Sequence, residues 1–538
     1  MLIKAMATVA GFTGLSRIAG MVRDILTASI LGAGPVADAF VVALKLPNFF
    51  RRITAEGAFN VSFVPLYTKV REEEGVEAAR KFAGNAYSIM AISLLVLCAV
   101  FVVFMPWVVR VTTPGFYEDP ERFNLAVEMS RISFPYLLFV SLAALLGGVL
   151  NAHRHFAPFA AAPLFFSFSL IGSLLIQKYF SFFETAGHAM AWGIFISGIL
   201  QMLFLMIFTK RYDLKIKFEM PVFDEKVKKL FRLMGPGVIG ASVVHINLLL
   251  DMVITSFLAA GSMSYLYYAD RLNQLPLGLV GIAISTALLP LLSYSLVSQK
   301  VDEARGLFNR ALEYSLMLSV PAAAALMIMP GPIIELLFQR GAFTEGDTTI
   351  TAQALAAYSL GLPGYIGAKI FATAYWAKHD TMTPVRVAII ATVLNIVMAA
   401  SFALLLGLGV VGIALATGIT GWVQLFLMNK GLKTMEAAHF DEKFRSNIFK
   451  ISMSVLLMAL ALFGLQIVLQ HFMADGFTHL AAGVLVLVGA GGVVYVGMIF
   501  LTGAIKLSEI LEFWNKRKFA RAELKKNDET NTLGNAAD

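Results

Sequence analysis

The sequence predicts an all-α polytopic membrane protein with fourteen transmembrane helices. Of its 538 residues, 58% are hydrophobic and only 14% are charged, and the mean hydropathy is +0.75. A soluble protein carries about a quarter charged residues. Apolar runs recur from the N-terminus to about residue 505, and a helix needs about 20 residues to cross a bilayer. The chain therefore has no room for a separate soluble domain.

Glycine, proline and charged residues bound the apolar runs and so place the individual spans. The predicted ranges are 5–32, 35–66, 83–111, 126–152, 159–180, 188–209, 228–259, 263–298, 309–336, 349–376, 384–406, 410–432, 447–470 and 479–505. The second and eighth runs are long, and we expect Pro47 and Pro276 to kink them. The single cysteine, Cys98, lies in an apolar run, which excludes a disulfide framework.

The basic residues alternate with the spans. Links after even-numbered spans carry lysine, arginine or histidine, as in residues 210–229 after the sixth span. Links after odd-numbered spans are neutral or acidic, as in residues 118–121 after the third. The positive-inside rule therefore places both termini in the cytoplasm. The net charge of +8 reflects this topology, and we expect no nucleic-acid partner.

An internal repeat relates the two halves of the chain. The residues that recur at a constant offset of 227 are Asp24, Ser29, Leu31, Ala33, Gly34 and Phe116. The first span then corresponds to the seventh, which predicts two parallel six-helix repeats followed by two C-terminal helices. Parallel repeats are typical of alternating-access transporters, with the substrate site between the halves.

The repeat defines the expected domains. They are an N-terminal six-helix lobe at 1–210, a cytoplasmic linker at 211–227, a C-terminal six-helix lobe at 228–432 and the last two helices at 433–505. The segment 506–538 begins with aromatic and basic residues that suit a helix lying on an anionic leaflet. Its last dozen residues are expected to be disordered.

Ionisable residues within the spans predict a polar cavity, because each costs at least about 2.5–3.5 kcal/mol to insert. The predicted substrate-binding residues are Arg17, Arg23, Asp24, Asp38, Lys45, Arg51, Arg52, Glu56 and Arg271. Cations outnumber carboxylates in this set, and a surplus of buried arginine calls for an anionic partner. The structural alternative is that such charges pair with one another and hold helices together, which applies above all to Arg51, Glu56 and Asp270.

Two further residues could hold a small cation. Asp251 and Asn395 offer oxygen ligands of the kind that sodium prefers. Ala399 stands one turn after Asn395, where a second carboxylate would have completed the site. No other cofactor is expected. His245 in the seventh span is interpreted as a packed histidine and not as a proton carrier.

The chain lacks the motifs of common enzyme classes. The patterns HExxH, GxSxG and GxxxxGK[ST] do not occur. Membrane-embedded transferases usually carry their catalytic acids in sizeable polar loops, whereas the links here are short and basic. The sequence therefore predicts a transporter and not an enzyme.

Several motifs resemble the bacterial MurJ (MviN) family of lipid II flippases. They are Ser16-Arg17, Arg23-Asp24, Ala37-Asp38-Ala39-Phe40, Lys45-Leu46-Pro47-Asn48, Arg51-Arg52, Ala55-Glu56-Gly57-Ala58-Phe59, Tyr267-Tyr268-Ala269-Asp270-Arg271-Leu272 and Thr383-Pro384-Val385. The resemblance implies the fold of the multidrug/oligosaccharidyl-lipid/polysaccharide exporter superfamily, with two lobes around a V-shaped cavity. It also implies that the last two helices form a groove for a polyprenyl tail.

The resemblance assigns roles to individual residues. It implies cavity arginines at Arg17, Arg23, Arg52 and Arg271, and acidic partners at Asp24, Asp38 and Glu56. Some relatives bind sodium through helices 7, 11 and 12, a pattern that Asp251 and Asn395 fit and Ala399 does not.

The expected function is translocation of lipid II, the lipid-linked peptidoglycan precursor, from the cytoplasmic to the outer leaflet of the bacterial inner membrane. Its pyrophosphate needs cations, its sugar-peptide head needs a wet cavity and its polyprenyl chain needs an apolar groove among membrane lipids. Two alternatives stay open: a flippase for another polyprenyl-pyrophosphate-linked oligosaccharide, and a cation-coupled multidrug exporter. An exporter of organic cations should have an acidic cavity, which disfavours the second.

Overall fold

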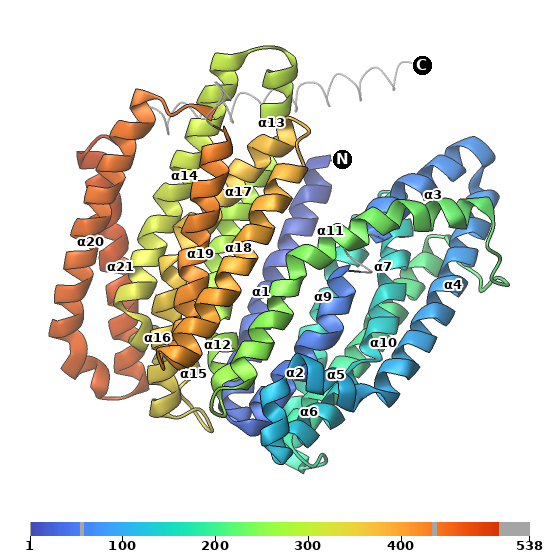
Figure 1. Ribbon diagram of the computed structural model, residues 1–538, viewed down its shortest axis with the longest axis horizontal. Helices are drawn as coiled ribbons and strands as arrows, with labels where there is room; N and C mark the ends of the chain where they lie inside the picture. The colour runs from blue at the N-terminus through green and yellow to red at the C-terminus, as the bar shows by residue number, and fades with distance from the viewer. Residues whose placement is uncertain (1, 54–58, 433–437, 505–538) are drawn as a thin grey trace, which may run out of the picture. The chain divides into compact units, whose positions relative to one another are not determined.

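The computed structural model describes residues 2–53, 59–432 and 438–504, with side chains omitted at 2–7, 60–61 and 236–245. All regular secondary structure within these ranges is helical (Figure 1). The prediction of an all-α protein is thereby confirmed. The expected surface helix and disordered tail at 506–538 lie outside the described residues.

In the first half of the chain, the structure describes the helices α1 to α10 and the 3₁₀ turn η2. They are α1 (Leu2–Leu31), α2 (Pro35–Arg51), α3 (Asn60–Glu74), α4 (Val76–Val103), α5 (Met105–Thr112), η2 (Pro114–Glu118), α6 (Pro120–Ser133), α7 (Tyr136–Ala152), α8 (Phe156–Ala161), α9 (Pro163–Phe180) and α10 (Ala186–Arg211).

Within its described residues, the second half continues with long helices and the π-helical turns η3 and η4. They are α11 (Glu225–Ser256), α12 (Ser262–Pro276), η3 (Leu277–Ile282), α13 (Ala283–Val297), α14 (Val301–Ile328), α15 (Pro330–Phe338), α16 (Glu345–Leu360), α17 (Leu362–Ala377), α18 (Met382–Ala400), η4 (Ser401–Leu405), α19 (Gly409–Leu432), α20 (Glu442–Ala474) and α21 (Phe477–Leu501).

Where the structure describes its residues, each predicted span coincides with one helix or with consecutive helices. Within the described residues, ten helical stretches are long and apolar enough to cross a membrane. The polytopic membrane class is therefore confirmed, while the count of fourteen stays a prediction. Proline explains several of the divisions, as at Pro135 between α6 and α7 and at Pro163 between α8 and α9. Proline suits the start of a helix and cannot supply the hydrogen bond that would continue one.

The predicted spans 35–66 and 263–298 differ in backbone geometry at their prolines, Pro47 and Pro276. Pro276 ends α12, and the backbone passes through the π-helical turn η3 before α13 begins. Such turns are a recognised cause of kinks in helices. Pro47 lies inside α2, where α-helical geometry continues to Arg51.

The described chain divides into two compact units. The larger comprises residues 1–275, 330–364 and 380–428; the smaller comprises 276–329, 365–379 and the part that begins at residue 429. Every described residue of the predicted site belongs to the larger unit. The smaller unit contains α20 and α21, which lie side by side (Figure 1). The proposed lobe boundaries and the polyprenyl groove stay predictions.

The linker that follows α10 is fastened to α4 within the larger unit. The Asn85 side chain donates to the Val222 carbonyl oxygen at 2.7 Å and accepts from the Val222 backbone N–H at 2.9 Å. Ser88 accepts from the backbone N–H of Glu219 at 3.0 Å. A Cβ on Gly84 would lie 2.6 Å from a linker carbonyl oxygen, so only glycine permits this approach.

Candidate functional site

Asp24 is the centre of a charged network between α1 and α12. Arg23 donates from Nη2 and Nε to Asp24 Oδ1 at 2.7 and 3.0 Å. The Tyr267 hydroxyl donates to the same oxygen at 2.9 Å. From α12, Arg271 Nε lies 3.4 Å from Asp24 Oδ2. One carboxylate therefore serves two guanidinium groups from distant parts of the chain.

Helical spacing and ring contacts orient the two cations. Tyr267 and Arg271 are four residues apart and share a face of α12, and Arg271 Nη2 donates to the Tyr267 hydroxyl at 3.0 Å. The Arg271 guanidinium also lies over the Tyr267 ring, 4.6 Å from its centre. Arg23 is buried, whereas the Arg271 side chain is 35% exposed. The network thus holds an excess positive charge, part of which solvent or a ligand can reach.

The other predicted cations lie at different depths. Arg17 is exposed on α1, about 9 Å along the helix axis from Arg23. On α2, Lys45 is half-buried, and Arg52 is exposed just after the helix ends. Arg51 lines a cavity of about 380 Å³ together with residues of α1, α7, α8, α9 and α10. Glu56 lies outside the described residues.

Asp38 occupies a different place from Asp24. Its side chain is fully buried and pairs with Arg122 Nη2 of α6 at 3.0 Å. It also accepts from the Gly261 N–H at 2.8 Å, the Ser264 N–H at 3.0 Å and the Ser264 hydroxyl at 2.7 Å. Its oxygens are thus occupied in this conformation, in which Asp38 links α2, α6 and α12.

Arg122 was not among the residues predicted from the sequence. The signal that could have found it is its position: an arginine that follows the acidic residues 118–121, where the pattern of basic links predicts no cation. Its guanidinium also donates to the Leu258 carbonyl oxygen at 3.2 Å and lies 4.1 Å from the centre of the Phe116 ring.

Further contacts accompany the Asp38 link, and we call them together the closed seam. They join residues 29–38 and 115–122 to residues 256–268 and Ala342. The Ala342 N–H donates to the Ser29 carbonyl oxygen at 2.8 Å, and the Tyr268 hydroxyl donates to the Gly32 carbonyl oxygen at 3.2 Å. The Gly115 N–H donates to Ser256 Oγ at 3.0 Å. A Cβ on Gly115 would lie 2.4 Å from the Ser256 carbonyl oxygen, so the seam requires glycine there.

The residues around Asp251 have the chemistry of a hard-cation site. Asp251 Oδ1, Asn247 Oδ1 and Asn395 Oδ1 are buried and lack a hydrogen-bond partner within the described part of the chain. They lie on α11 and α18, which pack together. Asn395 Nδ2 donates to the hydroxyls of Thr417 and Thr420, both at 3.3 Å. Amide and carboxylate oxygens are ligands of the kind that sodium prefers, and Asn247 offers one in addition to the predicted Asp251 and Asn395.

The fold and the charged network define a polytopic membrane transporter. The fold is similar to the solved structure "Inward-facing conformation of a multidrug resistance MATE family transporter of the MOP superfamily", with a TM-score of 0.65 and 16% identity, covering 80% of this chain and 98% of that one. A family model described as "Lipid II flippase MurJ" matches residues 27–482, and the chain belongs to this family. The resemblance read from the motifs is confirmed.

Individual relatives agree with the family model. The "Probable lipid II flippase MurJ" of Rhizobium meliloti (strain 1021) is 41% identical over 430 residues, covering 79% of this chain and 80% of that protein. The Rickettsia prowazekii (strain Madrid E) protein of the same name is 34% identical, covering 94% and 97%. The solved structure "Lipid II flippase MurJ, inward closed conformation" has a TM-score of 0.76 and 27% identity, covering 91% and 97%. The chain is therefore a multi-pass protein of the bacterial inner membrane.

Proposed function

We propose that the chain moves lipid II from the cytoplasmic to the outer leaflet by alternating access and carries out no catalysis. Membership of the flippase family supports the substrate. The observation that carries the mechanism is the sharing of one carboxylate, Asp24, between Arg23 and Arg271. Their surplus positive charge suits a pyrophosphate, which guanidinium groups bind through paired hydrogen bonds.

Substrate binding would compete with Asp24. A pyrophosphate offers several charged oxygens, so it can engage Arg271 in place of the 3.4 Å contact with Asp24. That exchange would release one of the contacts between α1 and α12. A ligand shifts a conformational equilibrium only through different affinity for the two states, and displacement of Asp24 supplies such a difference.

The closed seam would then be the barrier that opens on the outer side. Its hydrogen bonds join the two predicted repeats at Asp38 and at Ser29. Alternating access requires that this seam separates while the opposite side closes.

Orientation is part of the same proposal: both termini lie in the cytoplasm, and the links at Glu184 and Glu345, two exposed residues, face outward. Single cysteines at these two positions should react with an impermeant thiol reagent in intact cells. Cysteines at Lys215 and Arg305 should react only after the membrane is opened. Native Cys98 is buried and should stay unreactive. Labelling at Lys215 in intact cells would contradict the orientation.

We also propose that sodium binds at Asp251, Asn247 and Asn395 and that its binding favours one of the two transport states. The three unpartnered oxygens support this assignment. Asp251→Asn should abolish the stabilisation of the purified protein by sodium relative to potassium. A sodium effect that is unchanged in this variant would contradict the site.

The decisive test of the substrate is complementation. Cells depleted of their own lipid II flippase should survive when they express this chain, and an impermeant enzyme that cleaves lipid II should then find its substrate on the outer leaflet. Survival without outward exposure of lipid II would overturn the proposal. Export of another polyprenyl-linked oligosaccharide, or of organic cations, would favour one of the two alternative functions.

A further inference from the structure

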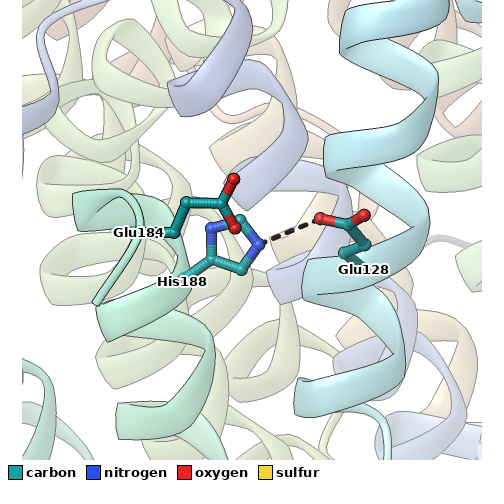
Figure 2. A group of neighbouring side chains, drawn as sticks. All are labelled: Glu128, Glu184 and His188. Atoms are coloured by element: carbon teal, nitrogen blue, oxygen red, sulfur yellow. Dashed lines mark hydrogen bonds and ion pairs between the residues drawn. The ribbon is translucent and has the colours of Figure 1, made fainter.

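Glu128, Glu184 and His188 form a cluster of metal-ligating side chains outside the transport site (Figure 2). Glu128 lies on α6, His188 is in the first turn of α10, and Glu184 is in the link before that helix. One ligand atom from each lies within 4.8 Å of the other two. Residues from two helices and a link therefore converge at one point.

The histidine is held in one orientation by its helix cap. Thr185 is the N-cap of α10 and accepts from the His188 backbone N–H at 3.3 Å. Its hydroxyl also lies 2.9 Å from His188 Nδ1. The His188 side chain is 9% exposed, and Nε2 points to Glu128 (Figure 2). In metal sites, the second ring nitrogen of a ligating histidine has such a partner, which fixes the ring and its tautomer.

The spacing of the ligand atoms suits a tetrahedral ion better than a simple ion pair. His188 Nε2 and Glu128 Oε2 are 3.3 Å apart, whereas a charge-assisted N–H···O bond is about 2.7–2.9 Å long. Zinc bonds to histidine nitrogen and carboxylate oxygen are each about 2.0–2.2 Å, which separates two tetrahedral ligand atoms by about 3.3–3.5 Å. These two atoms therefore have the separation that a shared zinc ion would impose.

The surroundings of the cluster are rigid on one side and open on the other. A Cβ on Gly187 would lie 2.4 Å from Met129 Cε, so the start of α10 packs closely against α6 beside the cluster. Glu128 and Glu184 are exposed, which leaves a path for an ion and freedom for Glu184 to close on it.

We propose that Glu128, Glu184 and His188 bind a divalent transition-metal ion of the zinc type, with a water molecule as the fourth ligand. One histidine nitrogen and two carboxylates match the ligand preferences of zinc. Magnesium and calcium prefer more oxygen ligands and six or more positions. The ion would fasten α10 to α6, the helix that also carries Arg122 of the closed seam.

The test uses the full-length protein in detergent, with any affinity tag removed and metals stripped by a chelator. Calorimetric titration with zinc should show one saturable ion per chain, and zinc should raise the unfolding temperature where magnesium does not. Cobalt at the same site should give the strong visible absorption of a tetrahedral complex. Glu128→Gln, Glu184→Gln and His188→Gln should each weaken zinc binding at least about tenfold, because each removes a direct ligand, and loss of a supporting partner alone costs about 10–100-fold.

The matched control is Glu121→Gln, which removes an exposed carboxylate from the same helix but outside the cluster; its zinc affinity should equal that of the unmodified protein. Glu184 is exposed in a link, so its variant keeps the test valid even if a change at His188 impairs folding. Absence of saturable zinc binding would overturn the proposal. So would equal zinc affinity in the Glu121→Gln and Glu184→Gln proteins.

Discussion

Asp38 and Arg122 form an ion pair with 3.0 Å between Oδ2 and Nη2, and their side chains are 0% and 5% exposed. The two residues come from α2 and α6, and the carboxylate also binds the backbone at Gly261 and Ser264. A buried pair of this kind adds little net stability relative to apolar residues, but removal of one partner leaves an uncompensated charge. We therefore expect that replacement of either Asp38 or Arg122 alone would disrupt the closed seam.

Asp38→Ala should reduce the free energy of unfolding by about 3–5 kcal/mol, because Arg122 would stay buried without its counterion. The double change Asp38→Ala with Arg122→Leu should recover part of this loss. Thermal unfolding of the purified protein measures both effects. The control is Glu118→Ala, which removes an exposed carboxylate just before α6. It should change the free energy of unfolding little. Equal destabilisation in the single and double variants would show that the charge pair is not the cause.

Arg271→Ala should lower the rate of lipid II flipping at least about tenfold, because the substrate loses a guanidinium from the Asp24 network. Arg271→Lys should recover the rate only in part, since an ammonium group cannot form the paired hydrogen bonds of a guanidinium. Gln274→Ala, an exposed change one turn along α12, serves as the control. Flipping is scored by outward exposure of lipid II at matched protein levels. Full activity of Arg271→Ala would remove this residue from the substrate site.

The two arginines of α1 should respond differently to alanine. Arg17→Ala should abolish complementation, because it removes a predicted substrate-binding cation. The unfolding temperature should stay unchanged, because Arg17 is exposed. Arg23 is buried against Asp24, so Arg23→Ala should lower both activity and stability. Thr13→Ala, one turn before Arg17, should be neutral in both measurements. A stability loss in Arg17→Ala equal to that in Arg23→Ala would contradict the different burial of the two side chains.

A disulfide across the closed seam should stop transport. The backbones of Ser29 and Ala342 are joined by a 2.8 Å hydrogen bond, so cysteines at both positions should pair and hold the seam shut. Gly261 is a poor site for a cysteine, because its φ is +93° and a Cβ there would lie 2.9 Å from the Tyr265 ring. Each single variant should remain active, and a reductant should restore the double variant. Efficient cross-linking with undiminished transport would disprove the need for the seam to open.

Stability should fall in mild acid because of His153. Burial, followed by the neighbouring Arg71, holds the pKa of His153 below its usual value, and its Nε2 lies 3.1 Å from the Tyr67 hydroxyl. The unfolded chain therefore takes up the proton first as pH falls. The stability from the neutral ring is complete above the usual pKa of about 6.5 and is lost as pH falls through that value toward the lower folded pKa.

The measurement is thermal unfolding between pH 8 and pH 5. His153→Gln should flatten the decline below about pH 6.5, whereas His479→Gln, an exposed histidine, should keep it. An unchanged pH profile in His153→Gln would assign the decline to other groups.

Local sequence was sufficient for the helices because a bilayer imposes a length and a polarity on each span. Runs such as 447–470 and 479–505 each coincide with one helix, α20 and α21. The divisions within other runs follow from prolines that the sequence displays, as at Pro163. The π-helical turn η4, Ser401–Leu405, contains no proline and was not predicted.

The charges of α1 and α2 were predictable as a group because each is costly in a membrane. Their individual roles were not. Asp24 and Asp38 look equivalent in sequence, but their surroundings differ. Asp24 pairs with the partly exposed Arg271, whereas Asp38 is fully buried in the closed seam. Asn247 was not predicted, although Asn395, another amide in a span, was; its place beside Asp251 is seen only in the structure, where its amide nitrogen lies 3.5 Å from Asp251 Oδ2.

The sequence by itself determined the membrane class, the positions of the helices and the surplus of cations, since these depend on composition and on residues close together in the chain. Only the tertiary structure decided which carboxylate each arginine meets. Asp38 and Arg122 are 84 positions apart, and Asp24 and Tyr267 are 243 apart. Contacts over such separations arise from helix packing, and no local periodicity encodes them.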